Sequence, residues 1–295
     1  MEMQPETTSE HCKQDSLGGM VTQMPEHPSV MPPAADPYSL SYSQYYVSEV
    51  LRTYQDPSST AREHLTTSLQ ILKSMENSKM PTRAKITDKM LDLPRRKGYE
   101  HKKTIVFDMD ETLIHCNESV DQPHDLKITI KFSKGETAEA GINIRPGAVE
   151  ILQALKGHYE VMVFTASHQC YANEILDYLD PEGELIHHRL YREHCSLTDS
   201  GYYVKDLRIL GRPMRDVLLV DNAAYSYAYQ LDNGVPILPY FHGSTDYELP
   251  ALQRYLLGLL EESDLRCPNI RLFKLGRYLE FHNNVDGLVS TLYEP

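Results

Sequence analysis

The feature that most constrains the fold is the stretch 103–113, in which two acidic residues directly follow a short apolar run. Residues 105–107, Ile-Val-Phe, are typical of a buried strand of a parallel sheet. Because alternate residues of a strand point to the same side, we expect the carboxylates of Asp108 and Asp110 to lie close together. Two buried carboxylates are costly unless a cation neutralises them, and Mg²⁺ suits such oxygen ligands. The alternative is a surface turn with two solvated acids.

Three further strand-like segments also end in polar residues. The segments and the residues that follow or end them are 159–164 with Thr165, 201–204 with Lys205, and 217–220 with Asp221 and Asn222. A hydroxyl and a lysine at strand ends can hold phosphate oxygens, whereas an acid and an amide can hold Mg²⁺. The alternatives are a helix N-cap by Thr165 or Ser167, an exposed lysine and an Asx-turn.

Composition narrows the class of protein. The chain has 295 residues, 41% hydrophobic and 24% charged, which is typical of a soluble globular protein. A net charge of −13 argues against direct nucleic-acid binding through a basic surface. No apolar run approaches the ~18 residues that would predict a membrane span. Five widely spaced cysteines and an N-terminus unlike a signal peptide predict reduced thiols and an intracellular protein. No feature requires more than a monomer.

The chain divides by composition. Residues 1–95 form an N-terminal extension, predicted to be largely disordered and fully so over 1–58 because Pro, Ser, Gln and Met dominate there. Within it, residues 63–80 form a possible helix with Leu65, Leu69 and Leu72 on one face. Residues 96–282 form the main domain, and 283–295 form a tail.

A basic segment precedes the first strand of the main domain. Arg95, Arg96, Lys97, Lys102 and Lys103 are interpreted as a solvated linker, with a nuclear-localisation signal as the alternative.

The main domain alternates strand and helix patterns, which predicts an α/β fold with a parallel sheet. Residues 126–132 alternate strictly between apolar and polar side chains and return through 142–144, which predicts a β-hairpin flap beside the acidic site. No long helical cap is visible between Phe164 and Lys205. The segment 187–195 contains His and Cys, but its spacing fits no structural zinc pattern.

Together these motifs resemble a known enzyme family. The sequences DMDETLIH at 108–115, FTAS at 164–167, YVKDL at 203–207 and LGR at 210–212 are similar to those of FCP/SCP phosphatases of the haloacid dehalogenase superfamily, which act on the RNA polymerase II C-terminal domain. The resemblance covers residues 96 to 279. It implies a haloacid-dehalogenase-like, doubly wound parallel sheet with a small β-hairpin flap and no large cap.

The resemblance also implies a mechanism. Asp108 would be the nucleophile that forms an aspartyl-phosphate, and Asp110 would be the general acid and base. Thr165 and Lys205 would bind the phosphoryl oxygens. Mg²⁺ would be held by the Asp108 carboxylate, the Asp110 main-chain carbonyl and Asn222, with Asp221 acting through water or hydrogen bonds. The candidate substrate contacts are Arg192 and Tyr171.

The expected substrate is a phosphoserine or phosphothreonine protein segment, with the RNA polymerase II C-terminal domain as one candidate. Glu118 and His168 depart from the family, because they stand where the family has apolar side chains in its proline pocket. Family analogy implies a nuclear location. The alternative functions are a non-catalytic phosphoprotein-binding scaffold, which loss of Asp108, Asp110 or Lys205 would have indicated, and a small-molecule phosphatase, which a large cap would have indicated.

Overall fold

The computed structural model describes residues 41–56, 58–76, 80–82, 86–132, 135–242, 246–281 and 287. The prediction of disorder for residues 1–40, and the predicted tail apart from residue 287, lie outside these ranges. The helices are α1 (Tyr42–Gln55), α2 (Thr60–Ser74), α4 (Ala148–Leu155), α5 (Gln169–Leu179), α6 (Glu248–Gly258), α7 (Arg266–Phe273) and α8 (Leu275–Phe281). The strands are β1 (Thr104–Phe107), β2 (Ile114–Cys116), β3 (Leu126–Lys131), β4 (Thr137–Ile144), β5 (Glu160–Phe164), β6 (His188–Leu190), β7 (Ser196–Leu197), β8 (Tyr203–Val204), β9 (Val217–Asp221) and β10 (Gly234–Pro236).

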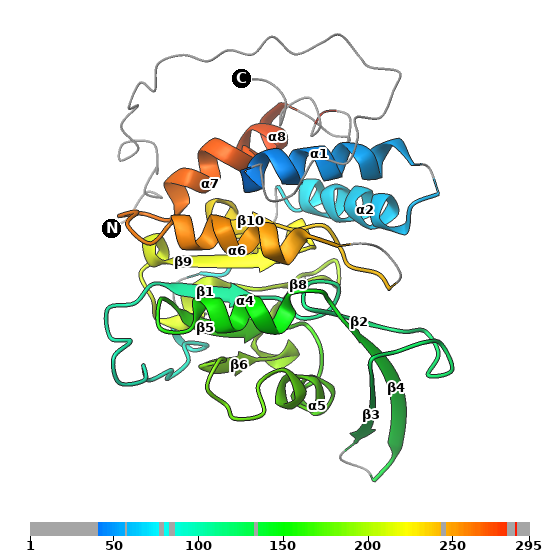
Figure 1. Ribbon diagram of the computed structural model, residues 1–295. Coiled ribbons are helices and arrows are strands. Elements are labelled where there is room, and N and C mark those ends of the chain that lie inside the picture. Colours follow the sequence, from blue (N-terminus) through cyan, green and yellow to red (C-terminus); the bar gives the residue numbers. More distant parts are fainter. Residues whose placement is uncertain are drawn as a thin grey trace. The chain divides into compact units, whose positions relative to one another are not determined.

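A five-stranded parallel sheet forms the centre of the domain (Figure 1). Its order is β10-β9-β1-β5-β6, so the chain moves outward from β1 through β5 to β6 and then returns to the other side of β1 through β9. Strands β1, β5 and β9 are buried along their whole length, which explains their continuous apolar character. The reversal of strand order beside β1 creates a topological switch point, where sheets of this class bind ligands. The predicted α/β fold is confirmed.

The predicted flap is a three-stranded antiparallel sheet of order β2-β4-β3. Strand β3 pairs with β4 from Leu126 opposite Ile142 to Lys131 opposite Thr137. Ile128 and Ile130 are buried while their neighbours along β3 are exposed, as the alternating sequence predicted. Helix α5 packs against β3. Between Phe164 and Lys205 the chain contains only α5 and short segments, so the prediction that no large cap is present is confirmed.

The strand before Lys205 differs from the prediction. Strand β8 has two residues and pairs antiparallel with β7, so it lies outside the parallel sheet. Lys205 is instead held by its main chain, whose N–H donates to the carbonyl of Ser226 at 2.8 Å. The sequence pattern predicted the extended backbone, but pairing with the main sheet depends on contacts distant in sequence.

The N-terminal helices show that the prediction of disorder through residue 58 is wrong for α1. Ser41 caps α1 in a capping box with Gln44, and the helix buries residues at helical spacing. These residues are Tyr42, Tyr45, Tyr46 and Val50. Tyrosine rings supply apolar area here, whereas the composition of residues 1–58 predicts too little of it for an ordered structure.

Helix α2 occupies residues 60–74, whereas the sequence predicted 63–80. Leu65, Leu69 and Leu72 are buried on one face, as predicted. Ser59 caps the start of α2, because its side chain accepts a hydrogen bond from the N–H of Arg62. Helix α1 packs against α6, and α2 packs against the 3₁₀ helix Ala224–Tyr227 (η5). The division of the chain at residue 96 stays a prediction.

The basic segment is packed against the domain, so its interpretation as a solvated linker is wrong for three of its residues. Arg95 donates to the carbonyl of Lys102 at 2.6 Å and Arg96 to that of Ile186 at 2.7 Å. Lys103 donates to the carbonyl of Leu260 at 2.7 Å. These hydrogen bonds attach the segment to main-chain carbonyl groups of the domain.

Cysteine chemistry agrees with the prediction only in part. Cys116, Cys170 and Cys195 are free thiols. Cys267 is disulfide-bonded, so the prediction of reduced thiols is wrong for this residue.

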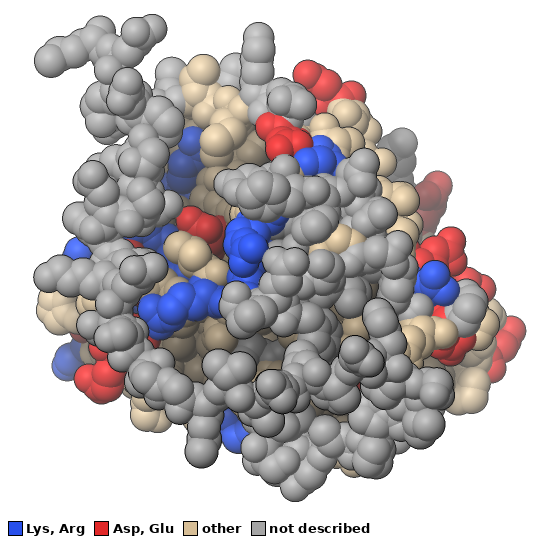
Figure 2. Space-filling model, turned by 90° about the horizontal axis from the view of Figure 1, so that it is seen from above, with Lys and Arg blue, Asp and Glu red and all other residues tan. Residues whose placement is uncertain are grey.

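The described surface carries both signs of charge. On the face seen in Figure 2, Lys and Arg side chains lie next to Asp and Glu side chains. No helix in the described ranges is both long and apolar enough to cross a lipid bilayer.

A buried acid lies where α1 meets α6. Glu248 is 3% exposed, and its Oε1 atom has no hydrogen-bond partner within the described structure. Burial, together with the charge of Asp246, raises the pKa of Glu248 to about 8, although Arg145 acts to lower it. The Tyr42 hydroxyl lies 3.5 Å from the other carboxylate oxygen of Glu248 and donates to the carbonyl of Pro236 at 2.8 Å.

This raised pKa makes stability depend on pH. Because the carboxyl ionises in the unfolded chain near its ordinary value of 4.5 but in the folded chain only near 8, stability falls as pH rises between these values. Glu248→Gln removes this effect, so wild type should lose about 4 kcal/mol of stability relative to the variant over that range. Urea unfolding near each end of the range measures the difference. The exposed Glu150→Gln should follow wild type, and an equal difference at both pH values would contradict the prediction.

Candidate active site

Two buried carboxylates meet one ammonium group at the carboxyl edge of the sheet. Asp108 follows β1, and Asp221 ends the neighbouring β9. The Lys205 Nζ atom donates to Asp108 Oδ1 and, at 2.6 Å, to Asp221 Oδ2. The side chains of Lys205, Asp108 and Asp221 are 2%, 9% and 1% exposed. The alternatives of a solvated turn and an exposed lysine are therefore wrong.

The pKa values of this cluster reflect strong mutual interactions. Burial acts to lower the pKa of Lys205, but Asp108 and Asp221 together raise it above its ordinary value. Burial and the charge of Asp108 raise the pKa of Asp221, whereas Lys205 acts to lower it. With all three groups ionised the cluster carries a net charge of −1, which favours a further cation.

Asp110 is surrounded by hydroxyl donors. Tyr171 donates to its Oδ1 at 2.8 Å, and Ser167 and Thr165 donate to its Oδ2 at 2.8 and 3.2 Å. Burial, together with the charges of Asp108 and Glu111, raises the pKa of Asp110 to about 6, although the hydrogen bonds from Tyr171 and Ser167 act to lower it. A carboxyl with this pKa can give and take protons near neutral pH.

Two of these donors are predicted site residues, and the third is Ser167. Tyr171, predicted as a substrate contact, uses its hydroxyl on Asp110. Thr165, predicted to bind phosphate, also contacts Asp110 and accepts a hydrogen bond from the N–H of Ser167 at 3.0 Å. The sequence predicts only an N-cap role for Ser167. The N-cap residue of α5 is instead His168, whose side chain forms no capping hydrogen bond. The sequence signal that could indicate Ser167 is the pair of hydroxyl residues in FTAS at 164–167, directly after the strand.

Oxygen donors for Mg²⁺ converge at the same edge. Asn222 Nδ2 lies 3.3 Å from the main-chain carbonyl of Asp110, and the Thr112 hydroxyl donates to Asp108 Oδ2 at 3.3 Å. Asp221 also forms the alternative Asx-turn, because its Oδ1 accepts from the N–H of Ala223 at 2.8 Å. Among the described residues no group of three His, Cys, Asp or Glu forms a metal cluster. The donors here are carboxylate, amide and carbonyl oxygens, which fit Mg²⁺.

Arg192 lies at the rim of this site. Its Nε atom donates to the carbonyl of Ala166 at 2.5 Å, and its Nη1 atom lies 3.0 Å from His168 Nε2. Its guanidinium also stacks over the ring of Tyr203, 5.2 Å from the ring centre. Arg192 is therefore positioned next to Thr165 but is engaged with the protein main chain.

The His- and Cys-containing segment 187–195 shows no zinc-like convergence. His187 Nδ1 accepts a hydrogen bond from the N–H of Val161, and His194 Nδ1 accepts from that of Tyr191. Cys195 is buried near the carbonyl of Thr165. These side chains form local hydrogen bonds and packing contacts.

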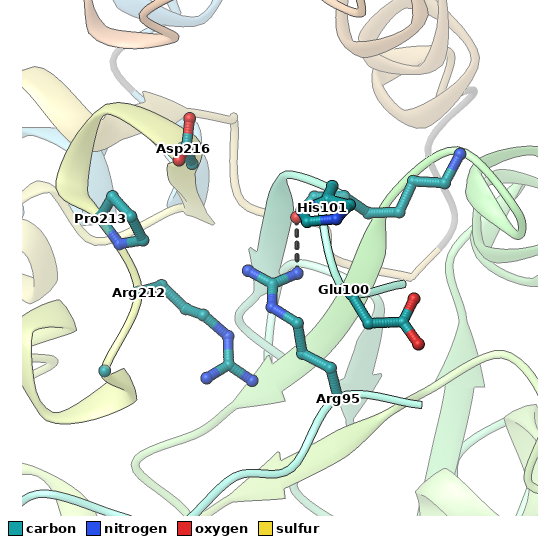
Figure 3. Close-up of a pocket in the computed structure, with 8 residues that line it drawn as sticks. Arg95, Glu100, His101, Arg212, Pro213 and Asp216 are labelled. Carbon is teal, nitrogen blue, oxygen red and sulfur yellow. Dashed lines mark hydrogen bonds between the residues drawn. The ribbon is translucent and has the colours of Figure 1, made fainter. Parts of the chain in front are cut away.

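A hollow of about 340 Å³ lies at the opposite edge of the sheet, at the amino ends of β1 and β9 (Figure 3). Arg95 and Arg212 line it, but both are paired with the buried Glu160. Arg212 donates to both carboxylate oxygens of Glu160, at 2.9 and 2.8 Å. This hollow is remote from the carboxylate cluster, and its arginines hold the fold.

Removing the central ammonium should destabilise the protein strongly. Lys205→Met leaves Asp108 and Asp221 buried without a cationic partner and should lower the free energy of unfolding by about 3–5 kcal/mol. The exposed pair of Lys156 and Glu184 provides the control, since Lys156→Met should cost less than about 1 kcal/mol. Denaturant unfolding in metal-free buffer measures both variants. Equal losses would show that Lys205 is not needed to neutralise the cluster.

Comparison with solved structures finds fission yeast RNA polymerase II CTD phosphatase Fcp1, at 20% identity with a TM-score of 0.40, covering 65% of this chain and 61% of that one. Among curated proteins, the chain is 40% identical over 185 residues to CTD small phosphatase-like protein 2 of Dictyostelium discoideum, covering 62% of this chain and 32% of that protein. It is 39% identical over 176 residues to CTD small phosphatase-like protein 3 of Caenorhabditis elegans, covering 60% and 61%.

The chain thus spans about a third to three fifths of the length of these relatives. The family model for NLI interacting factor-like phosphatases matches residues 103–266, which include β1, the flap, Lys205 and β9. This match covers more than half of the chain, and every polar residue of the cluster described above lies within it. The chain therefore belongs to the NLI interacting factor-like phosphatase family.

Proposed function

We propose that the protein is a Mg²⁺-dependent serine/threonine phosphoprotein phosphatase that acts through an aspartyl-phosphate. The observation that carries the proposal is the arrangement of Asp108 and Asp110. Asp108 is held by Lys205 at the switch point of the sheet, and Asp110 beside it has a raised pKa. Membership of the phosphatase family and names of the relatives support the same reaction class.

In the first step, an Asp108 carboxylate oxygen attacks phosphorus in line with the leaving oxygen of serine or threonine. The bond from phosphorus to that oxygen breaks, and protonated Asp110 gives it a proton. Lys205 lies against Asp108 and so reaches the oxygens of a phosphoryl group bound there, while Thr165 lies on the Asp110 side. Both residues stabilise the charge that develops during transfer.

In the second step, Asp110 takes a proton from water, which attacks the phosphorus of the aspartyl-phosphate. Phosphate leaves, and the Asp108 carboxylate is restored. Mg²⁺ held by the Asp108 carboxylate, the Asp110 carbonyl and Asn222, with Asp221 acting through water or hydrogen bonds, would offset repulsion between the nucleophile and the phosphate. The three hydroxyl donors keep Asp110 oriented through both steps.

The proposed substrates are phosphoserine and phosphothreonine protein segments. The flap and the short connection between β5 and Lys205 leave room for a polypeptide rather than enclosing a metabolite. Arg192 is the proposed contact to the substrate segment. Glu118 is exposed and His168 interacts with Arg192, so the region where the family has its apolar proline pocket is polar here. This favours phosphoprotein segments other than the RNA polymerase II tail. We propose a nuclear monomer without direct nucleic-acid binding.

Phosphate release from a panel of phosphoserine and phosphothreonine peptides tests the proposal. Wild type should turn over with Mg²⁺ and stop with EDTA. Asp108→Asn should lower kcat by about 10³-fold or more, because the amide is a poor nucleophile. Asp199→Asn, at an exposed turn, is the matched control and should retain activity.

The outcomes of this experiment distinguish a phosphatase from a non-catalytic phosphoprotein-binding scaffold. Trapping of a phosphorylated Asp108 in wild type, absent from the variant, would support the intermediate. Phosphopeptide binding without turnover in wild type would instead reject the enzyme and favour a phosphoprotein-binding scaffold.

Tyr171→Phe distinguishes positioning of Asp110 from contact with substrate. Because its hydroxyl donates to Asp110, the variant should lower kcat about 10-fold while KM changes less than about 2-fold. Steady-state kinetics on one phosphopeptide measures both constants. Tyr178→Phe, on the exposed part of α5, is the control. A raised KM with unchanged kcat would return Tyr171 to the role of a substrate contact.

A further inference from the structure

Helix α2 lies outside the residues that the family model matches, yet it packs against a segment that follows the proposed metal ligands. That segment is η5, which begins two residues after Asn222. The helix is fixed there by Leu65, Leu69 and Leu72, which are 6%, 2% and 1% exposed. Its contact with the domain is therefore a packed interface and not an incidental touch.

One side chain of α2 makes a specific polar contact with this segment. The Ser68 hydroxyl accepts a hydrogen bond from the N–H of Ala224 at 2.7 Å. Ser68 is 2% exposed, so water does not replace this acceptor in the folded protein. Without it, the Ala224 N–H would be a buried donor without a partner, which costs about 1–3 kcal/mol.

The segment held by Ser68 connects two parts of the proposed active site. At its start, Asp221 accepts from the N–H of Ala223, directly before Ala224. Further along, the carbonyl of Ser226 accepts from the N–H of Lys205. A displacement of η5 would thus move the loop that carries Asn222 and the main chain that carries Lys205.

The same face of α2 is also connected by ring contacts to the part of the site near Glu111. His64 lies one turn before Ser68, and its Nε2 atom is buried without a hydrogen-bond partner among the described residues. The His64 ring contacts Phe241, which contacts His115, and His115 interacts with Glu111 at 3.2 Å. The chain of contacts places α2 at the wall of the site rather than on a remote face.

We propose that α2 is a built-in wall of the active site and that Ser68 is a positioning residue, which holds the loop of Asp221 and Asn222 in the geometry that binds Mg²⁺. The inference rests on the proposed function and deepens it. It means that the domain matched by the family model is completed, in this chain, by a helix from the N-terminal segment.

The test compares Ser68→Ala with Thr66→Ala in the full chain. Thr66 lies on the same helix, and its hydroxyl donates within the helix, to the carbonyl of Arg62 at 2.8 Å. Alanine favours helix at both positions, so each variant should keep α2. Calorimetry without substrate should show Mg²⁺ affinity about 10-fold weaker for Ser68→Ala and nearly unchanged for Thr66→Ala. Hydrogen exchange should increase at Ala224 for Ser68→Ala alone.

Either of two results would overturn the inference. Unchanged exchange at Ala224 in Ser68→Ala would show that the hydroxyl does not hold the loop, whatever the activity of the protein. Faster exchange with unchanged Mg²⁺ affinity would show that the contact stabilises the fold but does not serve the site. Failure of the proposed function is recognised separately, because wild type would then neither bind Mg²⁺ nor release phosphate. The exchange at Ala224 could still increase in Ser68→Ala in that case. Absence of Mg²⁺ binding by wild type would also reject Ser68 as a positioning residue for the metal.

Discussion

The contact of one lysine with two buried carboxylates determines how the rest of the domain must be arranged. Asp108 and Asp221 come from neighbouring strands, and the register that pairs Phe107 with Val220 brings the two acids side by side. Neither could stay buried and ionised without Lys205, which arrives from outside the sheet. The fold therefore needs the switch point, the β1–β9 register and the connection before β9 to be correct together.

The sequence predicted the members of this cluster because parallel strands of one sheet end at the same edge. Asp108, Thr165, Asp221 and Asn222 follow from that rule and from short apolar runs. Lys205 was predicted by a strand pattern, although β8 pairs outside the sheet. The hydroxyl donors around Asp110 could not be predicted, because they depend on how α5 is rotated and on how close the β5 end lies to Asp110.

The N-terminal helices show a different limit of sequence reasoning. Their neighbourhood is rich in Pro and Ser, and a composition rule assigned it to disorder. What orders α1 is a set of tyrosines that become apolar surface once they pack, together with the Tyr42 hydroxyl bonded to the carbonyl of Pro236. Such residues satisfy their polar groups only after the partner surface exists, so the local pattern carries a weak signal.

The charges of the site support the proposal that the reaction uses a metal ion. A phosphomonoester brings about two negative charges to a site whose ionised groups already sum to −1, and Lys205 is shared between two carboxylates. Arg192 donates to a main-chain carbonyl at the rim of the site, so it does not neutralise the negative charge at Asp108. A divalent cation on the nearby oxygen donors would make approach of the phosphate favourable. In the proposed reaction, the contact that stabilises the fold would thus leave Lys205 alone insufficient to neutralise the phosphate, and the metal would depend on the position of the Asn222 loop.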